Sequence, residues 1–261
     1  MTDTQTTLSK ETSKTLNWFL FSAPSRFYFL AKKLIPIFWT LAIILGVTGL
    51  ALGLLYAPTD AVQGDSYRII FIHVPSAWMS MVLYVAMAFW GAIGLIFNAR
   101  LAYRLSNSIA LTGAIMTFIA LWTGALWGKP TWGTWWVWDA RLTSELILLF
   151  LYIGYLSLYN AIDDQRKALK ASSLLALIGV VNVPIIYFSV KWWNTLHQGA
   201  SITATKTSMD PSMLLAMLIM TFAFWAYAFA VIFTRANLKT LQEESHTDWV
   251  RNELKQLGVA S

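Results

Sequence analysis

The sequence predicts an all-α protein that crosses a membrane six times. Of its 261 residues, 57% are hydrophobic and only 12% are charged, whereas soluble domains carry about 25% charged residues. The apolar residues are also gathered into six runs, each long enough to cross the hydrocarbon core as a helix. The runs cover residues 35–57, 75–97, 105–127, 143–161, 171–190 and 211–234.

Both ends of the chain are predicted to lie outside this membrane domain of residues 35–234. Residues 1–34 are interpreted as a cytoplasmic polar tail followed by an amphipathic segment on the membrane surface, because aromatic residues there are mixed with Arg26, Lys32 and Lys33. They lack the apolar core and the small-residue cleavage site of a signal peptide, so we expect no cleavage there. Residues 235–261 are predicted to form a second cytoplasmic tail.

Lysine and arginine are distributed so that both termini are predicted to be cytoplasmic. If the two ends share one side of the membrane, fourteen of the 19 lysines and arginines lie on that side. Cytoplasmic segments carry such an excess, which also accounts for the net charge of +6 without a nucleic-acid partner. Three loops, 58–74, 128–142 and 191–210, then face outward. They hold the remaining basic residues, Arg68, Lys129, Arg141, Lys191 and Lys206.

The six apolar runs have no Asp, Glu, Lys, Arg or His in their interior. Ion-coupled transporters usually place ionisable groups at mid-depth, so this class is disfavoured. Two local patterns predict helix packing instead. Gly49 and Gly53 are four residues apart and predict a close helix contact, within the chain or with a partner subunit. Asn182 and Pro184 predict a kink in the fifth helix.

The second outward loop is rich in tryptophan. Five tryptophans fall within twelve positions of the stretch WGKPTWGTWWVWDARLTSE, which begins at residue 127. Tryptophan favours the membrane–water boundary, but this preference does not account for a cluster interleaved with glycine. If residues 132–139 are helical, Trp132, Trp135, Trp136 and Asp139 share one face. We predict a surface that binds a flat apolar partner, formed by Trp127, Trp132, Trp135, Trp136 and Trp138.

Two histidines flank this loop and lie on the same predicted face of the membrane. His73 is at the outer end of the second span and His197 is in the third outward loop, whereas His246 is in the cytoplasmic tail and is given no role. Taken singly, each of the first two is typical of a loop histidine bonded to its surroundings. Together, two neutral imidazoles beside an aromatic surface describe a six-coordinate haem site, with His73 and His197 as the axial iron ligands.

Basic residues near the loop are candidates to hold the propionates of such a haem. They are Lys129, Arg141 and Arg68, and arginine is favoured because its planar fork binds a carboxylate at two points. Two structural alternatives stay open. Arg141 can pair with Glu145, which follows it by one helical turn. Asp139 fits the N-cap of the fourth helix better than it fits a chemical role.

Other chemistries are disfavoured by what the sequence lacks. The absence of cysteine excludes disulfides, thiolate metal sites and a thioether link to haem. The stretch GALWGKP at 124–130 has the wrong glycine spacing for a phosphate loop, and Pro130 stands where Ser or Thr is required. Nothing in the sequence resembles a Ser–His–Asp arrangement or a carboxylate metal cluster. We therefore expect no nucleotide hydrolysis and no enzymatic activity.

The Trp-rich stretch closely resembles the WWD domain of bacterial haem-handling membrane proteins. The strings SYRIIFIHVPSAW and WWNTLHQG are similar to the two histidine-bearing loops of the CcmC family, which belongs to cytochrome c maturation system I. The resemblance covers residues 35–234. Related WWD proteins that act as haem lyases or synthases are usually larger and have more spans, so the length of this chain favours CcmC.

The resemblance implies a function and a set of partners. A CcmC-like protein holds haem b transiently, as cargo, on the periplasmic face of the bacterial inner membrane, between the histidines that match His73 and His197. It delivers this haem to the haem chaperone CcmE, alongside the small protein CcmD and the ABC-type pair CcmA and CcmB, which supplies ATP hydrolysis. Two alternatives stay open: a subunit that moves haem across the bilayer with an ABC-type partner, and a scaffold that recruits that pair.

Overall fold

The computed structural model describes residues 23–197 and 209–258, and this part of the chain is helical without a β-strand. Six of its helical segments are long and apolar enough to cross a membrane, which confirms the predicted all-α fold with six spans. The elements in order are α1 Pro24–Ala51, a π-helical turn Leu52–Tyr56 that continues it, a 3₁₀ helix Asp65–Ile69, α2 Ile70–Phe97, α3 Arg100–Trp132, α4 Ala140–Ala161, α5 Gln165–Gly179, α6 Asn182–Trp192, α7 Pro211–Glu243 and α8 Asp248–Gln256.

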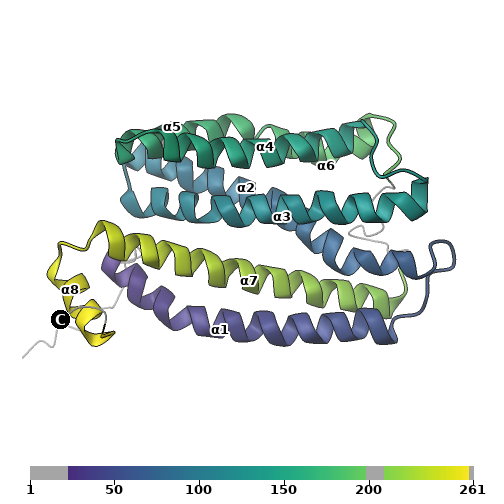
Figure 1. Cartoon of the computed structure of the whole chain (residues 1–261), viewed down its shortest axis with the longest axis horizontal. Helices are drawn as coiled ribbons and strands as arrows, with labels where there is room; N and C mark the ends of the chain where they lie inside the picture. The colour runs from purple at the N-terminus through teal and green to yellow at the C-terminus, as the bar shows by residue number, and fades with distance from the viewer. Residues whose placement is uncertain (1–22, 198–208, 259–261) are drawn as a thin grey trace, which may run out of the picture.

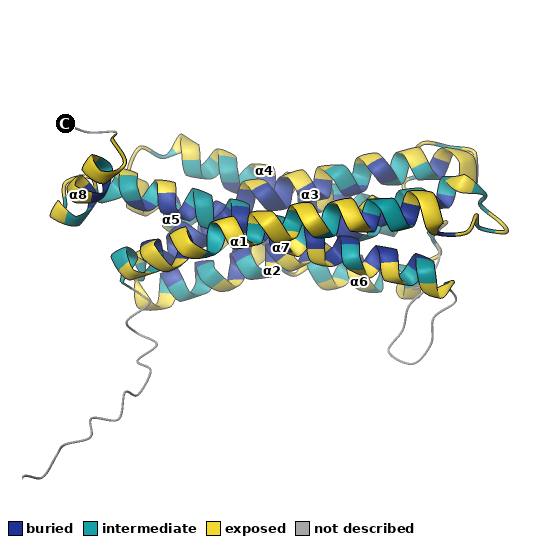
Figure 2. Cartoon of the chain, turned by 90° about the horizontal axis from the view of Figure 1, so that it is seen from below, coloured by how far each residue is buried: buried dark blue, intermediate teal, exposed yellow. Residues whose placement is uncertain are grey.

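Three groups of helices make up the bundle (Figure 1). Helices α1 and α7 pack along each other as an antiparallel pair, α2 packs along α3, and α4 packs on α5 and α6. Helix α2 begins beside α1 and α7 at one end of the bundle and reaches α5 at the other end, so it connects the groups. Buried residues lie on the faces that the helices turn to one another, and exposed ones lie outside (Figure 2). The outer faces carry large apolar side chains such as Ile43 and Phe222, which suits contact with lipid.

The first span is longer than the sequence predicted. Helix α1 begins at Pro24 rather than near residue 35, and residues 24–34 continue directly into the span instead of forming a separate segment. Proline suits the first position of a helix because the missing N–H has no acceptor there. The turns of α1 formed by residues 24–34 are bonded to α8. Lys32 Nζ donates to Glu253 Oε1 at 2.5 Å, and Tyr28 Oη donates to the same oxygen at 2.9 Å. The rest of the predicted N-terminal segment lies outside the described residues.

The fifth span is broken as predicted. Helix α5 ends at Gly179 and α6 begins at Asn182, with a turn at residues 180–181 between them. Pro184 has no N–H to give to the carbonyl oxygen of residue 180, so this oxygen accepts from Val183 instead, at 3.0 Å. Asn182 Nδ2 donates to the carbonyl oxygen of Ser144 on α4 at 2.9 Å. The break is thereby fixed against the neighbouring span.

The predicted close contact at Gly49 and Gly53 is confirmed, and it lies within the chain. A Cβ atom at residue 49 would be 2.8 Å from the Met220 side chain of α7, and one at residue 53 would be 2.5 Å from the ring of Phe71 on α2. Both distances are shorter than van der Waals contact. Glycine at these two positions therefore lets α1 and its π-helical turn approach both neighbouring helices closely.

The centre of the bundle contains an even closer contact. Gly113 of α3 lies against Tyr152 of α4, and a Cβ at residue 113 would be only 2.2 Å from Cζ of this ring. Tyr152 is fully buried, and its hydroxyl donates to the carbonyl oxygen of Ser80 on α2 at 2.8 Å. This one side chain thus joins α2, α3 and α4 beneath the end of the bundle where the Trp-rich loop lies.

Orientation in the membrane stays a prediction, and the natural absence of cysteine makes it testable. Thr131 lies at the end of the bundle that carries the Trp-rich loop, and Gln165 begins α5 at the opposite end; both residues are exposed. We expect a membrane-impermeant maleimide to label Thr131→Cys in intact spheroplasts but not Gln165→Cys, because the Lys and Arg count places residue 165 in the cytoplasm. Both variants should react after permeabilisation. The reverse pattern in intact spheroplasts would contradict the assigned topology.

Candidate functional site

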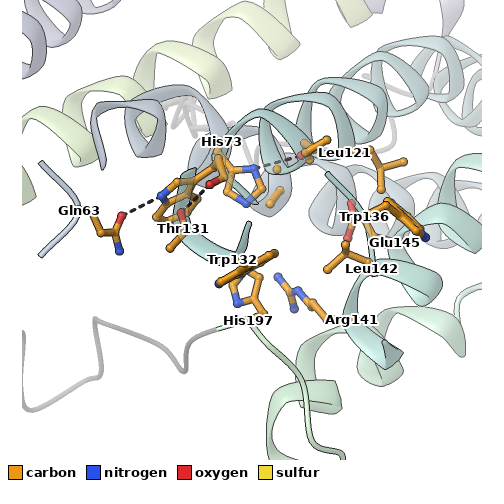
Figure 3. Close-up of a pocket in the computed structure, with 15 residues that line it drawn as sticks. Gln63, His73, Leu121, Thr131, Trp132, Trp136, Arg141, Leu142, Glu145 and His197 are labelled. Atoms are coloured by element: carbon orange, nitrogen blue, oxygen red, sulfur yellow. Dashed lines mark hydrogen bonds between the residues drawn. The ribbon is translucent and has the colours of Figure 1, made fainter. Parts of the chain in front are cut away.

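One pocket brings together most of the predicted site residues at the end of the bundle that carries the Trp-rich loop (Figure 3). Its walls come from α2, α3, the start of α4, and the segments 57–64 and 193–197. The predicted residues that line it are His73, Trp127, Trp132, Trp136, Arg141 and His197. Trp135, Trp138 and Asp139 do not line it.

His73 is held by α3 in one defined orientation. It lies in the first turn of α2, at the end of the second span as predicted, because this helix already begins at Ile70. Its Nδ1 is 3.1 Å from the carbonyl oxygen of Ala120 and 3.1 Å from Thr123 Oγ1. A carbonyl oxygen can only accept, so Nδ1 carries the proton and donates it. Nε2 then keeps its lone pair, which is the tautomer that a metal ligand requires.

His197 approaches His73 from the segment that follows α6. The two imidazole centroids are 6.5 Å apart with an interplanar angle of 34°, and the His197 ring is 6.3 Å from the ring of Trp132. Metal–imidazole bonds are about 2 Å long, so an ion bound between two imidazoles holds their centroids about 6 to 7 Å apart. The observed spacing therefore suits one metal ion with an axial ligand on each side.

Residues 132–139 do not form one helix, so the condition under which the tryptophans would share a helical face is not met. Helix α3 continues to Trp132 and ends there because Gly133 adopts a left-handed conformation with φ of 78°. Asp139 then caps α4, with its side chain accepting from Leu142 N at 2.8 Å, which confirms the predicted N-cap. Between these two signals the chain is irregular. A helix cannot run through a C-terminal stop and an N-terminal start.

The tryptophans of the irregular segment 133–139 fall into two sets, one that lines the pocket and one that is exposed. Trp136 turns into the pocket, whereas Trp135 and Trp138 are 54% and 77% exposed and form the outer surface of the loop. Trp138 packs edge-on against Trp136, with ring centroids 5.4 Å apart. On the opposite wall, Trp127 lies edge-on to His73 at 5.5 Å and its Nε1 donates to Gln63 Oε1 at 2.8 Å.

Of the three basic candidates, only Arg141 reaches the pocket. Arg68 already donates to Asp65 and to the backbone carbonyls of Gly53 and Ala57. Lys129 donates to the Gly133 carbonyl oxygen at 3.1 Å, outside the pocket. Arg141 lines the pocket and donates from Nη1 to the carbonyl oxygen of Ile186, at 2.7 Å.

Arg141 does not form the ion pair with Glu145 that the sequence left open, since no contact within 4 Å joins these two described residues. Glu145 is instead 6% exposed at the floor of the pocket, where its Oε1 accepts from Ser80 Oγ at 2.7 Å. Its Oε2 has no donor among the described residues.

The free space in the pocket is small in this conformation. The cavity measures about 60 Å³, whereas pockets for ligands of drug size enclose about 300–1,000 Å³. The two histidines are already far enough apart to hold an ion between them. The additional volume that a large ligand needs must therefore open beside the line that joins the two imidazole rings. Residues 133–139 and 193–197 form part of these walls and are not helical. A large ligand must move these two segments apart.

Comparison with known proteins identifies the family. The sequence profile described as "CcmC: Heme exporter protein C" matches residues 17–251. The chain belongs to the CcmC family. It is 44% identical to "Heme exporter protein C" of Haemophilus influenzae over 88% of this chain and 94% of the relative, and 45% identical to the protein of that name from Escherichia coli K12 over 90% and 95%. It is also 46% identical to the "Putative cytochrome c biosynthesis ccmC-like mitochondrial protein" of Marchantia polymorpha, over 69% of this chain and 77% of the relative. The profile match includes every residue predicted for the site.

Some residues of the pocket escaped the sequence analysis. Gln63 had no local pattern that marked it, because its role is to accept from a tryptophan 64 residues away. Ala120 acts through its carbonyl oxygen, which any residue provides. Gly124 leaves room for the imidazole, since a Cβ there would be 3.2 Å from His73 Cε1. Glu145 is predicted from the sequence only as a partner of Arg141, although an acidic residue near the end of an apolar run is itself a signal of a functional site.

Proposed function

We propose that the protein binds haem at the periplasmic face of the bacterial inner membrane and delivers it to the haem chaperone CcmE during cytochrome c maturation. The observation that carries this proposal is the pair of imidazoles 6.5 Å apart, with Nδ1 of His73 bonded to the backbone and its Nε2 left to bind a metal. Membership of the CcmC family and the names of its relatives support haem as the cargo.

In the proposed complex, each group of pocket residues has a different role in binding haem. His73 and His197 ligate the iron from the two faces of the porphyrin and fix its height in the pocket. Trp127, Trp132 and Trp136 supply apolar surface around the ring. Arg141 binds a propionate. Haem b is bound transiently in this scheme, so it is cargo and not a resident cofactor.

Delivery requires that part of the haem stay within reach of another protein. The pocket lies at the end of the bundle where short loops of the described chain join the helices (Figure 1). The exposed rings of Trp135 and Trp138 border it and offer apolar area for the docking of CcmE. We propose that CcmD and the ABC-type subunits CcmA and CcmB act with this chain, and that the pair provides the ATP hydrolysis for which this sequence has no site.

A haem-transporting subunit is the second candidate function. It is supported by the word "exporter" in the names of the relatives and by a second cavity of about 990 Å³ in the other half of the bundle. This cavity lies between α7 and the α2–α3 pair and is lined by aromatic side chains that include Trp90, Trp225 and Phe229. Haem uptake into vesicles that contain only this chain would favour transport over delivery.

The delivery proposal predicts that covalent loading of CcmE depends on this chain. In a strain that lacks the chain and carries an inactive ABC pair, so that product accumulates, haem staining of CcmE on a denaturing gel should fall to background. Expression of the chain should restore the signal. Expression of the His246→Ala variant should restore it equally, since this exposed histidine lies between α7 and α8, at the end of the bundle opposite to the pocket. Undiminished loading in the strain without the chain would contradict delivery.

A further inference from the structure

We propose that the second cavity, between α7 and the α2–α3 pair, binds one phospholipid with an anionic headgroup, whose phosphate is held by Arg100 and Arg166. The site lies in the other half of the bundle from the pocket that contains the two histidines, and it does not depend on the proposed haem function. It assigns to lipid the cavity that the transport alternative would assign to haem.

The wall of this cavity is polar at one end and apolar along the rest of its length. The described wall residues that are charged or carry a hydroxyl group lie at the end near α8, and they are Arg100, Glu244, His246 and Thr247. The other described wall residues are apolar or aromatic, and they include Met79, Trp90, Ile109 and Phe229. A cavity of this kind matches a ligand that has one polar end and a long apolar body.

The dimensions of the cavity suit a lipid from a single leaflet. On α2 its wall runs from Ile93 to Met79, which is about 21 Å along the helix axis. One leaflet with its headgroups is about 20–22 Å thick, half of the whole bilayer. The volume of about 990 Å³ is at the upper end of the range for ligand pockets. Water is a poor filler for the apolar part, because each buried water needs two to four polar partners.

The cavity opens sideways, in the direction of the surrounding lipid. Trp225 and Phe229 of its wall are each 37% exposed. They continue an exposed apolar stripe that contains Leu218 and Phe222 on α7, because residues three or four apart share one face of a helix. Acyl chains can therefore enter from the bilayer without crossing the bundle.

Arg100 connects the polar end of this cavity to a smaller one. The smaller cavity measures about 290 Å³ and is also lined by Arg104 and Arg166. Neither Arg100 nor Arg166 forms an ion pair within 4 Å in the described part of the chain. Guanidinium groups bind phosphate oxygens well, since their planar fork offers two donors side by side.

The acidic residues at this end are already paired. Arg104 is buried between α3 and α7, where its Nε donates to Glu243 Oε2 at 2.6 Å and its Nη1 donates to Glu244 Oε1 at 2.9 Å. Together with Arg100 and Arg166, three arginines face two carboxylates, so the cluster keeps a net positive charge. This charge favours an anionic headgroup over a zwitterionic one.

Haem fits this cavity less well than a lipid does. Proteins normally hold haem through axial side-chain ligands on the iron. The described wall has a single imidazole, that of His246 at the polar end, and so offers no pair of histidines like His73 and His197. We therefore assign the cavity to lipid and make competition by haem part of the test.

Native mass spectrometry of the purified and delipidated full-length chain measures this binding directly. The probes are phosphatidylglycerol and phosphatidylcholine with the same acyl chains, added as an equimolar mixture. We expect the first lipid that binds to be mainly phosphatidylglycerol. Inorganic phosphate at the same concentration should not displace it, which distinguishes a lipid from a free anion as the ligand.

Arg100→Gln should lower the preference for phosphatidylglycerol about fivefold, because each basic residue close to an anionic lipid surface strengthens binding by about that factor. Arg166→Gln should act in the same direction. Lys167→Gln is the matched control, since it removes a positive charge from the same end of the bundle, but Lys167 is 79% exposed and lines neither cavity. Ala86→Phe adds a ring to the apolar wall and should weaken both lipids by the same factor.

Three results would overturn the inference. Equal binding of the two lipids by the wild type, or equal effects of Arg100→Gln and Lys167→Gln, would contradict the anion site. Unchanged lipid binding in Ala86→Phe would mean that the lipid lies outside the cavity. Displacement of the bound lipid by haem in the double variant His73→Ala and His197→Ala would assign the cavity to haem and favour transport.

Discussion

Replacing either His73 or His197 by alanine is expected to lower haem affinity by at least about 10–100-fold, the range measured when a group that only supports a metal ligand is removed. In the proposed site each imidazole supplies one of two axial bonds to the iron, since the ring centroids are 6.5 Å apart, and the described chain has no other histidine in the pocket. The measurement is the absorption spectrum and haem content of the purified variants. Added imidazole should partly restore both, because it can enter the space that the side chain leaves.

His246→Ala serves as the matched control and should retain normal spectra. Thr123→Val should give an intermediate result, since it removes one of the two hydrogen-bond partners of His73 Nδ1 and leaves the Ala120 carbonyl oxygen. Unchanged spectra in both His73→Ala and His197→Ala would rule the pair out as axial ligands.

Gly113→Ala is expected to destabilise the fold by about 1–3 kcal/mol, the usual range when a packed core receives an extra methyl group, or by more. The new Cβ would be 2.2 Å from the ring of Tyr152, which is fully buried and so has little space to move away. A shift of this ring also lengthens its hydrogen bond to the Ser80 carbonyl oxygen, now 2.8 Å. Thermal unfolding in detergent would show this as a lower midpoint and a lower yield of folded protein.

Gly154→Ala makes the same chemical change at a site with room for it. The nearest atom to a Cβ at residue 154 is Cδ2 of Leu175, at 3.5 Å, which is an ordinary van der Waals contact. Alanine also favours helix over glycine by roughly 0.5–1 kcal/mol. We expect a midpoint equal to or above that of the wild type. If Gly113→Ala matched Gly154→Ala, the close contact between α3 and α4 would not be required for stability.

Much of the fold followed from local patterns. The six spans were predictable because hydrophobicity over about 20 residues is what places a helix in a bilayer. The break before Asn182 and the cap at Asp139 were also predictable, since each depends on the backbone chemistry of a few neighbouring residues. The start of α1 was missed because residues 24–34 are not apolar enough to read as a span. Their helix is held in part by Glu253, 221 residues away from Lys32 in the chain.

The candidate site was only partly predictable for the same physical reason. The sequence by itself determined which chemical groups are present near the end of the spans that carries the Trp-rich loop: the two imidazoles, the five indoles and the nearby basic residues. Only the tertiary structure decided that Trp136 turns inward and Trp138 outward, that Arg141 and not Lys129 or Arg68 reaches the pocket, and that Glu145 is buried at its floor. These outcomes depend on where α3 stops relative to the start of α4 and the end of α6. Side-chain direction in an irregular segment follows from contacts with distant parts of the chain, and no periodic pattern in the sequence records such contacts.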